Sequence, residues 1–330
     1  MSRYVYKYMP LRVEFFENLL IRATPAISLN DPFEFVFNEN QVKNSNKNFL
    51  LLQEEKNTSF SEEDADFQVK NDCEVIDSEL RDLGVLSFTE DYNNILMWSH
   101  YANEHKGMVV EFDLSKPLFS SSILEICGRR HRFKEDVFGF VNEYPKKIKY
   151  RSEFPEFDRP EFSNPTDGFS YPWKKFNEAI LYTKADAWMY EKEYRSIVHL
   201  KDADVIMCEN YNSYIEEICL QDEKIIVSEC NGRTKICFPD EYEMHEDMGD
   251  QSLKTEIFFR TQFESEKNLH LFKINPECIS SIFFGCYADT DLIHKSILFA
   301  KENLPNLSTE NIFKMERSNY LYRLEKNKFI

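Results

Sequence analysis

Glycine scarcity limits what this chain can fold into more than any other feature of its sequence. Eight glycines occur in 330 residues, where an average share of about 7% would give about 23. The two that are closest in sequence, Gly128 and Gly139, are eleven positions apart. A loop that cradles phosphate needs glycines one to five residues apart, because only a backbone without Cβ approaches phosphate that closely. The Walker A, Rossmann and kinase glycine loops are therefore excluded, and any nucleotide site here must be made by side chains.

The net charge of −18 argues against general nucleic-acid binding. An acidic surface repels the phosphate backbone, and binding that releases counterions needs clustered Lys and Arg. The two short basic runs, at 128–132 and 145–149, fit ordinary solvated surfaces better than binding patches. A local basic groove stays open as an alternative.

Cysteine spacing and the N-terminal residues predict a cytoplasmic protein with reduced thiols. None of the eight cysteines forms a C-x-x-C pair, and H-E-x-x-H does not occur, so these spacings predict no metal site. Residues 1–7 lack the apolar core of a signal peptide, and no apolar run reaches eighteen residues. We therefore expect no membrane association.

Hydrophobic periodicity predicts an α+β fold, with mixed or antiparallel sheets and flanking helices, because the strands come in runs rather than in strict βαβ alternation. The expected strands are 4–8, 20–23, 85–89, 108–112, 190–200, 256–263, 269–274 and 279–285, with a hairpin at 225–238 and one or two strands at 311–326. The expected helices are 11–20, 72–83, 91–106, 173–187 and 290–303.

The chain divides into two parts at about residue 200. Residues 1–200 are expected to form the core, with a polar surface insertion at about 38–72 and a proline-rich loop at 153–172. Residues 201–330 are the least informative stretch. They either complete the sheet or form a recognition lobe.

The first segment that could carry chemistry is the N-terminal strand. Alternation places Tyr4, Tyr6 and Tyr8 on one face of the strand, and Val5 and Lys7 on the other. Read alone, the segment fits an edge strand with its aromatic rings packed inward and Lys7 in solvent.

The second segment joins a strand to a helix. Ser87 and Thr89 share one strand face, so both hydroxyls can serve one site. On the following helix, Trp98, Tyr101 and His105 form one stripe. Stripes at this spacing are usually core, so a buried aromatic seam is the simpler interpretation.

The third segment is acidic. If 190–200 is a strand, Glu191, Glu193 and Arg195 point the same way, with the two carboxylates about 7 Å apart. Such a group is either an ion network on a solvated face or a catalytic set, in which one carboxylate stabilises a developing cation and the other polarises a nucleophile. The spacing alone does not decide between them.

Together these segments resemble an uncharacterised bacterial family, domain of unknown function 2971. The motifs that carry the resemblance are Tyr6-Lys7-Tyr8, Asn30-Asp31-Pro32-Phe33, Ser87-Phe88-Thr89-Glu90, Met97-Trp98-Ser99-His100-Tyr101-Ala102, His105-Lys106-Gly107 and Tyr190-Glu191-Lys192-Glu193-Tyr194-Arg195.

A fainter resemblance links the same chain order to the ADP-ribosyltransferase fold, which has a two-sheet core. It implies that Lys7 holds the phosphate or ribose of NAD, that Ser87 and Thr89 support the site, that Glu193 bonds the nicotinamide ribose and that Glu191 orients the acceptor. This sequence departs from the family pattern at two points. Lys7 stands where arginine is usual and cannot form a bidentate clamp, and no third serine follows Thr89.

The resemblance implies an enzyme that cleaves NAD as its substrate, in the manner of a bacterial toxin or a phage-defence effector. Loss of nicotinamide leaves an oxocarbenium-like sugar, which a fixed carboxylate such as Glu193 would stabilise. The other residues expected to bind NAD are Tyr6, Tyr8, Trp98, His105 and Arg195. The acceptor is an unidentified protein or nucleic acid, and a neutralising partner protein is conceivable.

Two alternatives stay open at this point. The first is a non-enzymatic module of the same fold that binds a nucleotide or a partner. The second is a hydrolase or nuclease that uses Glu191, Glu193, His100 and His105.

Overall fold

The computed structural model describes residues 3–45, 62–120, 142–156, 171–239, 249–264 and 267–329. Within these residues, one branched sheet of 13 strands accompanies a small sheet in which β6 (Lys149–Arg151) pairs in parallel with β7 (Thr183–Ala185). Nearly all pairs of the large sheet are antiparallel, and β13–β14 is parallel. The predicted α+β fold with a mixed sheet is confirmed. Among the described residues, no helix is both long enough and apolar enough to cross a bilayer.

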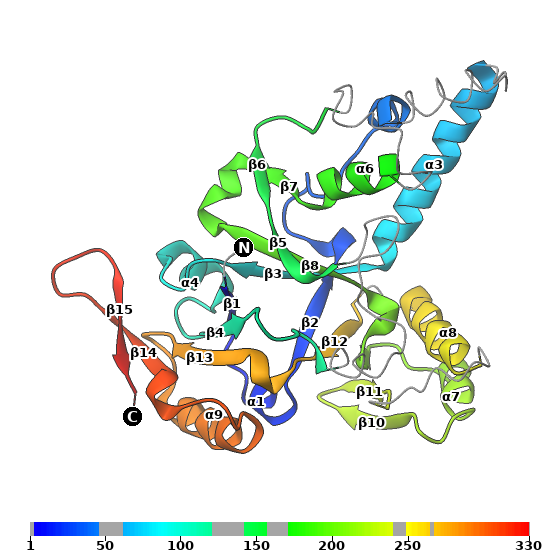
Figure 1. The fold of residues 1–330 in the computed structure, drawn as a ribbon. Coiled ribbons are helices and arrows are strands. Elements are labelled where there is room, and N and C mark those ends of the chain that lie inside the picture. The colour runs from blue at the N-terminus through cyan, green and yellow to red at the C-terminus, as the bar shows by residue number, and fades with distance from the viewer. Residues whose placement is uncertain are drawn as a thin grey trace.

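The large sheet branches at β3 (Leu83–Thr89). One edge of β3 pairs along its whole length with β8 (Glu193–His199), from Leu83↔His199 to Thr89↔Glu193. The other edge is shared, because β2 (Leu20–Pro25) pairs with its N-terminal half and β1 (Tyr4–Met9) meets it at Thr89. Two arms of strands therefore diverge from β3 (Figure 1).

Strands from the C-terminal part of the chain extend both arms. One arm continues from β1 through β4 (Met108–Asp113), β13 (Ile279–Phe284), β14 (Ile312–Arg317) and β15 (Leu324–Lys328). The other continues from β2 through β12 (Leu269–Lys273), β9 (Val205–Cys208), β11 (Arg233–Cys237) and β10 (Ile226–Cys230). On the far edge of β8 lies β5 (Asn142–Lys147).

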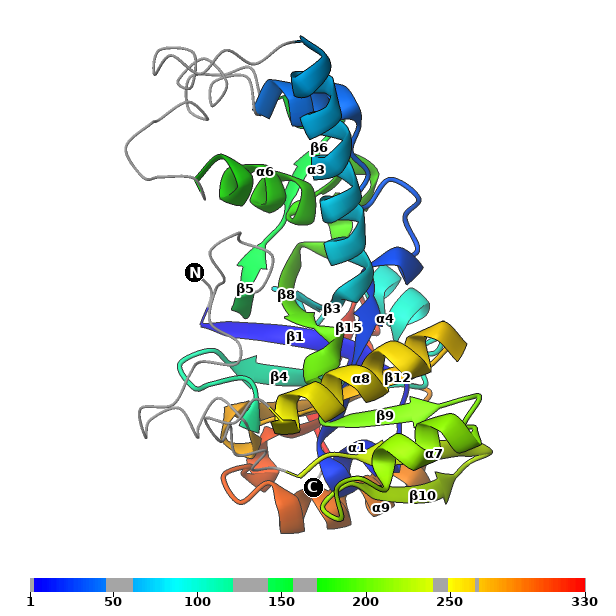
Figure 2. The same ribbon diagram turned by 90° about the vertical axis from the view of Figure 1, so that its right-hand side faces the viewer.

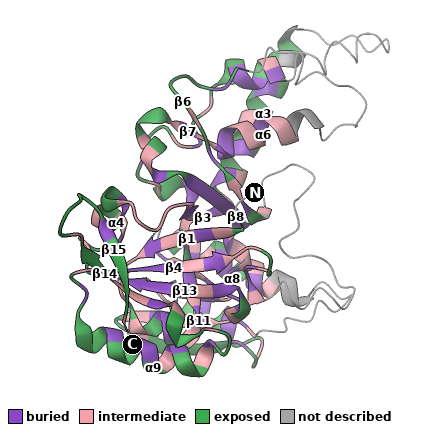
Figure 3. Cartoon of the chain, turned by 60° about the vertical axis from the view of Figure 1, so that its left-hand side comes forward, coloured by how far each residue is buried: buried purple, intermediate pink, exposed green. Residues whose placement is uncertain are grey.

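Helices cover the two arms and the β8 side of the sheet. The first arm packs α1 (Val13–Asn18) against α9 (Thr290–Asn303), and the second carries α7 (Ser213–Cys219) beside α8 (Gly249–Glu264) (Figure 2). The upper part of the molecule holds α3 (Glu62–Asp82) and α6 (Tyr171–Leu181). Buried residues concentrate in the strands around β3 and β8, as Figure 3 shows.

Several sequence predictions agree with these elements. The hairpin β10–β11 turns at Asn231-Gly232, where both residues have positive φ, at 51° and 75°, as a tight two-residue hairpin requires. The helix predicted at 290–303 is α9. The N-terminal strand is β1, but it lies between β3 and β4 and is not an edge strand.

Other predictions were wrong. Residues 256–263 are helical, within α8, and not a strand. Ile257, Phe258 and Thr261 are buried there, with the spacing of one helix face. In the sequence, the consecutive apolar residues Ile257–Phe259 made this stretch look like a strand. The helix expected at 72–83 begins ten residues earlier, at Glu62, and takes in part of the predicted polar insertion, because nothing in those residues breaks a helix. Residues 46–61 of that insertion and residues 157–170 of the proline-rich loop lie outside the described residues.

The helix expected at 91–106 is shorter than its pattern implied. Here α4 spans Ile95–Tyr101, and the Asn94 side chain accepts hydrogen bonds from the N–H groups of Leu96 and Met97. Residues 103–105 then take positive φ. Gly107 therefore does not end a helix that reaches Lys106. It lies close to β1, and a Cβ at this position would stand 2.4 Å from the Met9 carbonyl oxygen.

Gly107→Asn should destabilise the protein by about 3 kcal/mol or more, because backbone atoms surround the missing Cβ and cannot yield. The matched variant Gly232→Asn should cost under about 1 kcal/mol, since Asn tolerates positive φ and a Cβ there meets nothing within 4 Å. Urea unfolding of both variants measures the difference. Equal costs would contradict the steric role of Gly107.

Candidate functional site

A cleft of about 310 Å³ opens where the two arms diverge from β3. It is lined by β1, β2, β3, the turn after β2, and the 3₁₀ segment η5 (Asp186–Glu191) that precedes β8. Seven of the predicted site residues line it: Tyr6, Lys7, Tyr8, Ser87, Thr89, Glu191 and Glu193. The structure thus brings three segments that are far apart in the sequence to one cavity.

Three other predicted site residues do not line the cleft. Trp98 is fully buried, with its ring edge-on to Tyr8 at 5.3 Å and its indole N–H donating to the Tyr92 carbonyl oxygen at 2.9 Å. His105 lies in the turn after α4 with φ 66°, beside Tyr287 and not in a stripe with Trp98. Arg195 is fully buried behind the carboxylates. Trp98 and His105 therefore belong to the packing around the site.

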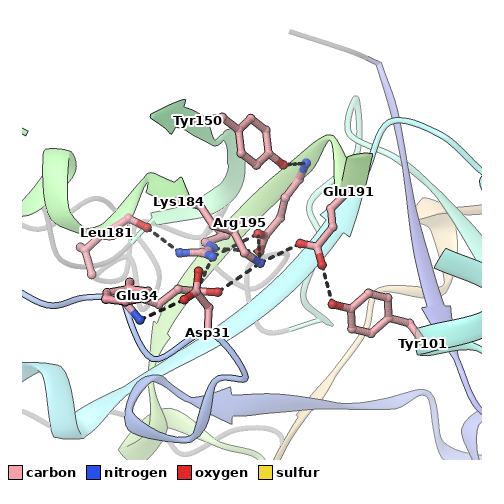
Figure 4. A network of polar contacts seen from close by, with 10 residues as sticks. Asp31, Glu34, Tyr101, Tyr150, Leu181, Lys184, Glu191 and Arg195 are labelled. Atoms are coloured by element: carbon pink, nitrogen blue, oxygen red, sulfur yellow. Dashed lines mark hydrogen bonds and ion pairs between the residues drawn. The ribbon is translucent and has the colours of Figure 1, made fainter. Parts of the chain in front are cut away.

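A buried ion network forms one wall of the cleft (Figure 4). At its centre, Nζ of Lys184 lies 3.1 Å from Glu34, 2.7 Å from Glu191 and 3.1 Å from Glu193. All four side chains are at most 7% exposed. Carboxylates that are buried to this degree need charged partners to offset the loss of water.

Arg195 completes the network from within the protein. Its Nε donates to Glu193 Oε1 at 2.8 Å, and its Nη2 donates to Glu193 Oε2 at 3.1 Å and to Glu34. Its Nη1 donates to the Leu181 carbonyl oxygen at 3.1 Å. This planar fork is the bidentate geometry that lysine cannot supply.

Electrostatics favour the charged forms of Glu193 and Lys184 in the network. Burial opposes the charge on Glu193, but Arg195 and Lys184 outweigh it and lower the pKa of Glu193 to about 2. Burial likewise opposes the charge on Lys184, yet the three carboxylates raise its pKa above the usual value. For Glu34, burial prevails over Arg195 and Lys184 and raises its pKa. Glu193 is therefore a permanent anion at neutral pH.

Glu191 and Glu193 reach the network by different routes. Glu193 and Arg195 lie on one face of β8, as the alternation predicts, whereas Glu191 ends η5 and Lys192 between them has φ 47°. The prediction of one continuous strand face is thus wrong for Glu191. Its carboxylate is held by Lys184 and by the Tyr101 hydroxyl of α4, which donates to Oε1.

Lys7 faces the cleft rather than open solvent. Its Nζ donates to the Ser87 carbonyl oxygen at 2.9 Å and lies 5.4 Å from the centre of the Phe88 ring. Burial lowers the pKa of Lys7 to about 8, against the opposing pull of Glu193. Lys7 is therefore a cation whose charge changes close to neutral pH.

The hydroxyl groups of β3 and of the tyrosines on β1 make different contacts. A hydrogen bond from Ser87 helps to lower the pKa of Glu193, whereas Thr89 Oγ1 accepts from the Asp91 N–H at 3.2 Å and shapes the turn after β3. The Tyr8 hydroxyl donates to the Asp91 carbonyl oxygen at 2.9 Å and accepts from the Asn94 N–H at 3.1 Å, so it ties β1 to the start of α4. Tyr6 lines the cleft beside Tyr92.

Sequence reasoning missed several residues of the site. Glu34 and Asp31 follow the end of β2, and the motif Asn30-Asp31-Pro32-Phe33 marked that turn without indicating its role. Arg22 on β2 and Lys184 on β7 carried no signal, because an isolated basic residue on a short strand is common. Among the described residues, no group of three or more His, Cys, Asp or Glu side chains is arranged to hold a metal ion.

Arg195→Met should destabilise the protein by about 3–5 kcal/mol, because Glu193 and Glu34 would lose a buried cation. The matched variant Arg323→Met breaks an exposed pair with Glu325 at 3.5 Å and should change stability little. Chemical denaturation of both variants at neutral pH measures the contrast. An equal and small effect of the two would show that the buried network does not stabilise the fold.

The comparisons with known proteins identify one region of the chain. Residues 97–196 match the model of a family described as a protein of unknown function, DUF2971. The matched region includes α4 from Met97 onward, Lys184 and the Glu191–Arg195 segment, but not β1 or β3. No curated protein and no solved structure matches the chain. The match therefore supports the predicted resemblance to DUF2971 across residues 97–196.

Proposed function

We propose that the cleft binds NAD and that the protein is an NAD-dependent ADP-ribosyltransferase. The observation that carries this proposal is the convergence of Lys7, Ser87, Glu191 and Glu193 on one cavity. Catalytic groups must reach one reacting centre, and these four come from three strands and a 3₁₀ segment that meet only at the branch of the sheet. They follow one another in the sequence in the order basic residue, serine and two glutamates, which is the order that carries the resemblance to ADP-ribosyltransferases.

The chemistry that follows breaks the bond between the ribose C1′ and the nicotinamide nitrogen. The bonding electrons leave with nicotinamide, and positive charge develops on the sugar. Glu193 is a fixed anion and needs no reorganisation to stabilise that charge. The acceptor then bonds to C1′ and releases its proton to water, while Glu191, on the same wall, orients the acceptor.

Two positively charged side chains of the cleft, on β1 and β2, suit the phosphates of a dinucleotide. Lys7 on β1 and Arg22 on β2 both line the cleft. Arg22 forms no ion pair with another described residue, and partial loss of solvent around its guanidinium, together with the nearby charges of Arg12 and Arg233, lowers its pKa. Its guanidinium can bind phosphate bidentately, which Lys7 cannot.

A binding module without catalysis is the second candidate, and one observation favours it. Both oxygens of Glu193 are already engaged, Oε1 by Arg195 and Oε2 by Arg195 and Lys184. A carboxylate held in this way could be purely structural. Binding of NAD without release of nicotinamide would distinguish this function from transfer.

Glu191→Gln and Glu193→Gln should each reduce nicotinamide release from NAD by about 100-fold or more, because each removes a negative charge from the reacting centre. Labelled NAD incubated with protein and cell lysate measures both nicotinamide release and label transfer. Glu34→Gln is the comparison variant: it perturbs the same network but leaves the charges of Glu191 and Glu193 in place, so it should reduce activity much less than either of them.

Wild-type protein that neither releases nicotinamide nor labels an acceptor would refute the transferase. An equal loss in all three variants would assign the glutamates a structural role only. Circular dichroism of each variant establishes that the assays compare folded proteins.

NAD affinity should fall as pH rises through about 8, because Lys7 loses its charge there and with it the attraction for phosphate. The sign follows from a lowered pKa, since the amine is charged below 8 and neutral above it. Calorimetric titration between pH 7 and 9.5 measures the change. Lys7→Arg keeps the charge across this range, so its affinity should stay level, and a parallel decline in the variant would exclude Lys7 as the titrating group.

A further inference from the structure

Asp31 is the one carboxylate lining the cleft for which the described residues leave an oxygen without a hydrogen-bond partner. Its Oδ1 accepts from the Phe33 N–H at 2.9 Å, while Oδ2 has no partner. The residue is only 5% exposed. A buried acceptor that lacks a partner costs about 1–3 kcal/mol, so its retention needs a reason.

The other acidic side chains of the cleft provide the contrast. Glu34 and Glu193 each contact both Lys184 and Arg195, and Glu191 contacts Lys184 and Tyr101. Asp31 lies beside this network (Figure 4) yet pairs with neither of its cations. Lys184 and Arg195 pair with the three glutamates and not with Asp31, so pairing within the network does not explain why an aspartate is buried at this position.

The backbone fixes Asp31 in this position. Pro32 follows it, the Glu34 N–H donates to the Asp31 carbonyl oxygen at 3.2 Å, and Phe35 is held at φ 61°. The Phe33 N–H orients the carboxyl group through Oδ1, which leaves Oδ2 as the atom that is not used by the turn. A turn of this kind needs only one side-chain oxygen.

We propose that Asp31 is a ligand contact of the cleft, whose Oδ2 accepts a hydrogen bond from a hydroxyl or N–H group of the bound nucleotide. The inference rests on the proposed function for the identity of the ligand. In NAD the donor is a ribose hydroxyl, the carboxamide NH₂ group of nicotinamide or the amino group of adenine. A single carboxylate oxygen of an enzyme commonly takes the first of these donors in dinucleotide sites.

The variant Asp31→Asn isolates this contact. Its remaining oxygen can still accept from the Phe33 N–H, whereas an NH₂ group replaces Oδ2 and would oppose a ligand donor. The matched control is Asp222→Asn, because Asp222 accepts from the Lys224 N–H at 2.9 Å in an equivalent turn and does not line the cleft.

Calorimetric titration of both variants with NAD and with ADP-ribose, which lacks the carboxamide, gives the first readout. We expect Asp31→Asn to bind NAD at least about 10-fold more weakly than wild type and Asp222→Asn to bind it equally. A parallel loss for ADP-ribose assigns the contact to a group that both ligands contain, a ribose hydroxyl or the adenine amino group, and a loss confined to NAD assigns it to the carboxamide. Unchanged NAD affinity in Asp31→Asn would overturn the inference.

Thermal unfolding without ligand gives the second readout and does not depend on the proposed function. A ligand contact predicts that Asp31→Asn melts at or above the wild-type temperature, because an oxygen kept for a ligand makes no stabilising contact in the free protein. A lower melting temperature would show that Asp31 is structural. If wild-type protein binds neither NAD nor ADP-ribose, the proposed function fails, and the inference is then decided by this readout alone.

Discussion

The pairing of Lys184 and Arg195 with three buried carboxylates is the interaction on which the site depends. These charges lie where β8 meets β3, at the point where the sheet divides. Each carboxylate alone would favour its neutral form after losing water, and each cation alone would be costly to bury. Together they hold η5, β7, β8 and the turn after β2 against one another, so that the wall of the cleft is set before any ligand arrives.

The branch of the sheet explains how a chain with so few glycines could hold a nucleotide at the proposed site. A glycine loop brings the backbone to the phosphate, whereas here the strands β1 and β2 separate from β3 and leave room for side chains. Gly84 and Gly107 serve close packing instead. At Gly84 a Cβ would stand 2.6 Å from Leu200 and 2.8 Å from Ala23, and at Gly107 it would meet the backbone of β1.

Much of the fold and part of the site could be predicted from the sequence, because local patterns determine both. Alternation located β1 and β3 with Lys7 and Ser87, and the Asn231-Gly232 pair located its hairpin. The predictions that were wrong concern segments whose conformation depends on tertiary contacts. The run Ile257–Phe259 resembles a strand until its helical burial is seen, and the stripe from Trp98 to His105 ends early because residues 103–105 take positive φ. Lys184, the centre of the network, had no local signature at all.

Both oxygens of Glu193 are bound by Arg195 and Lys184, and this arrangement is compatible with both candidate functions. A carboxylate with both oxygens bound to cations is a weaker hydrogen-bond acceptor, but its negative charge remains, and the pKa of about 2 keeps it ionised. Stabilisation of a cationic sugar needs charge in a fixed place more than a free lone pair. Binding and catalysis would therefore use different oxygens of one wall. In this proposal Asp31 would offer the acceptor that recognises the ligand, and the paired glutamates would supply the electrostatic field in which the ligand reacts.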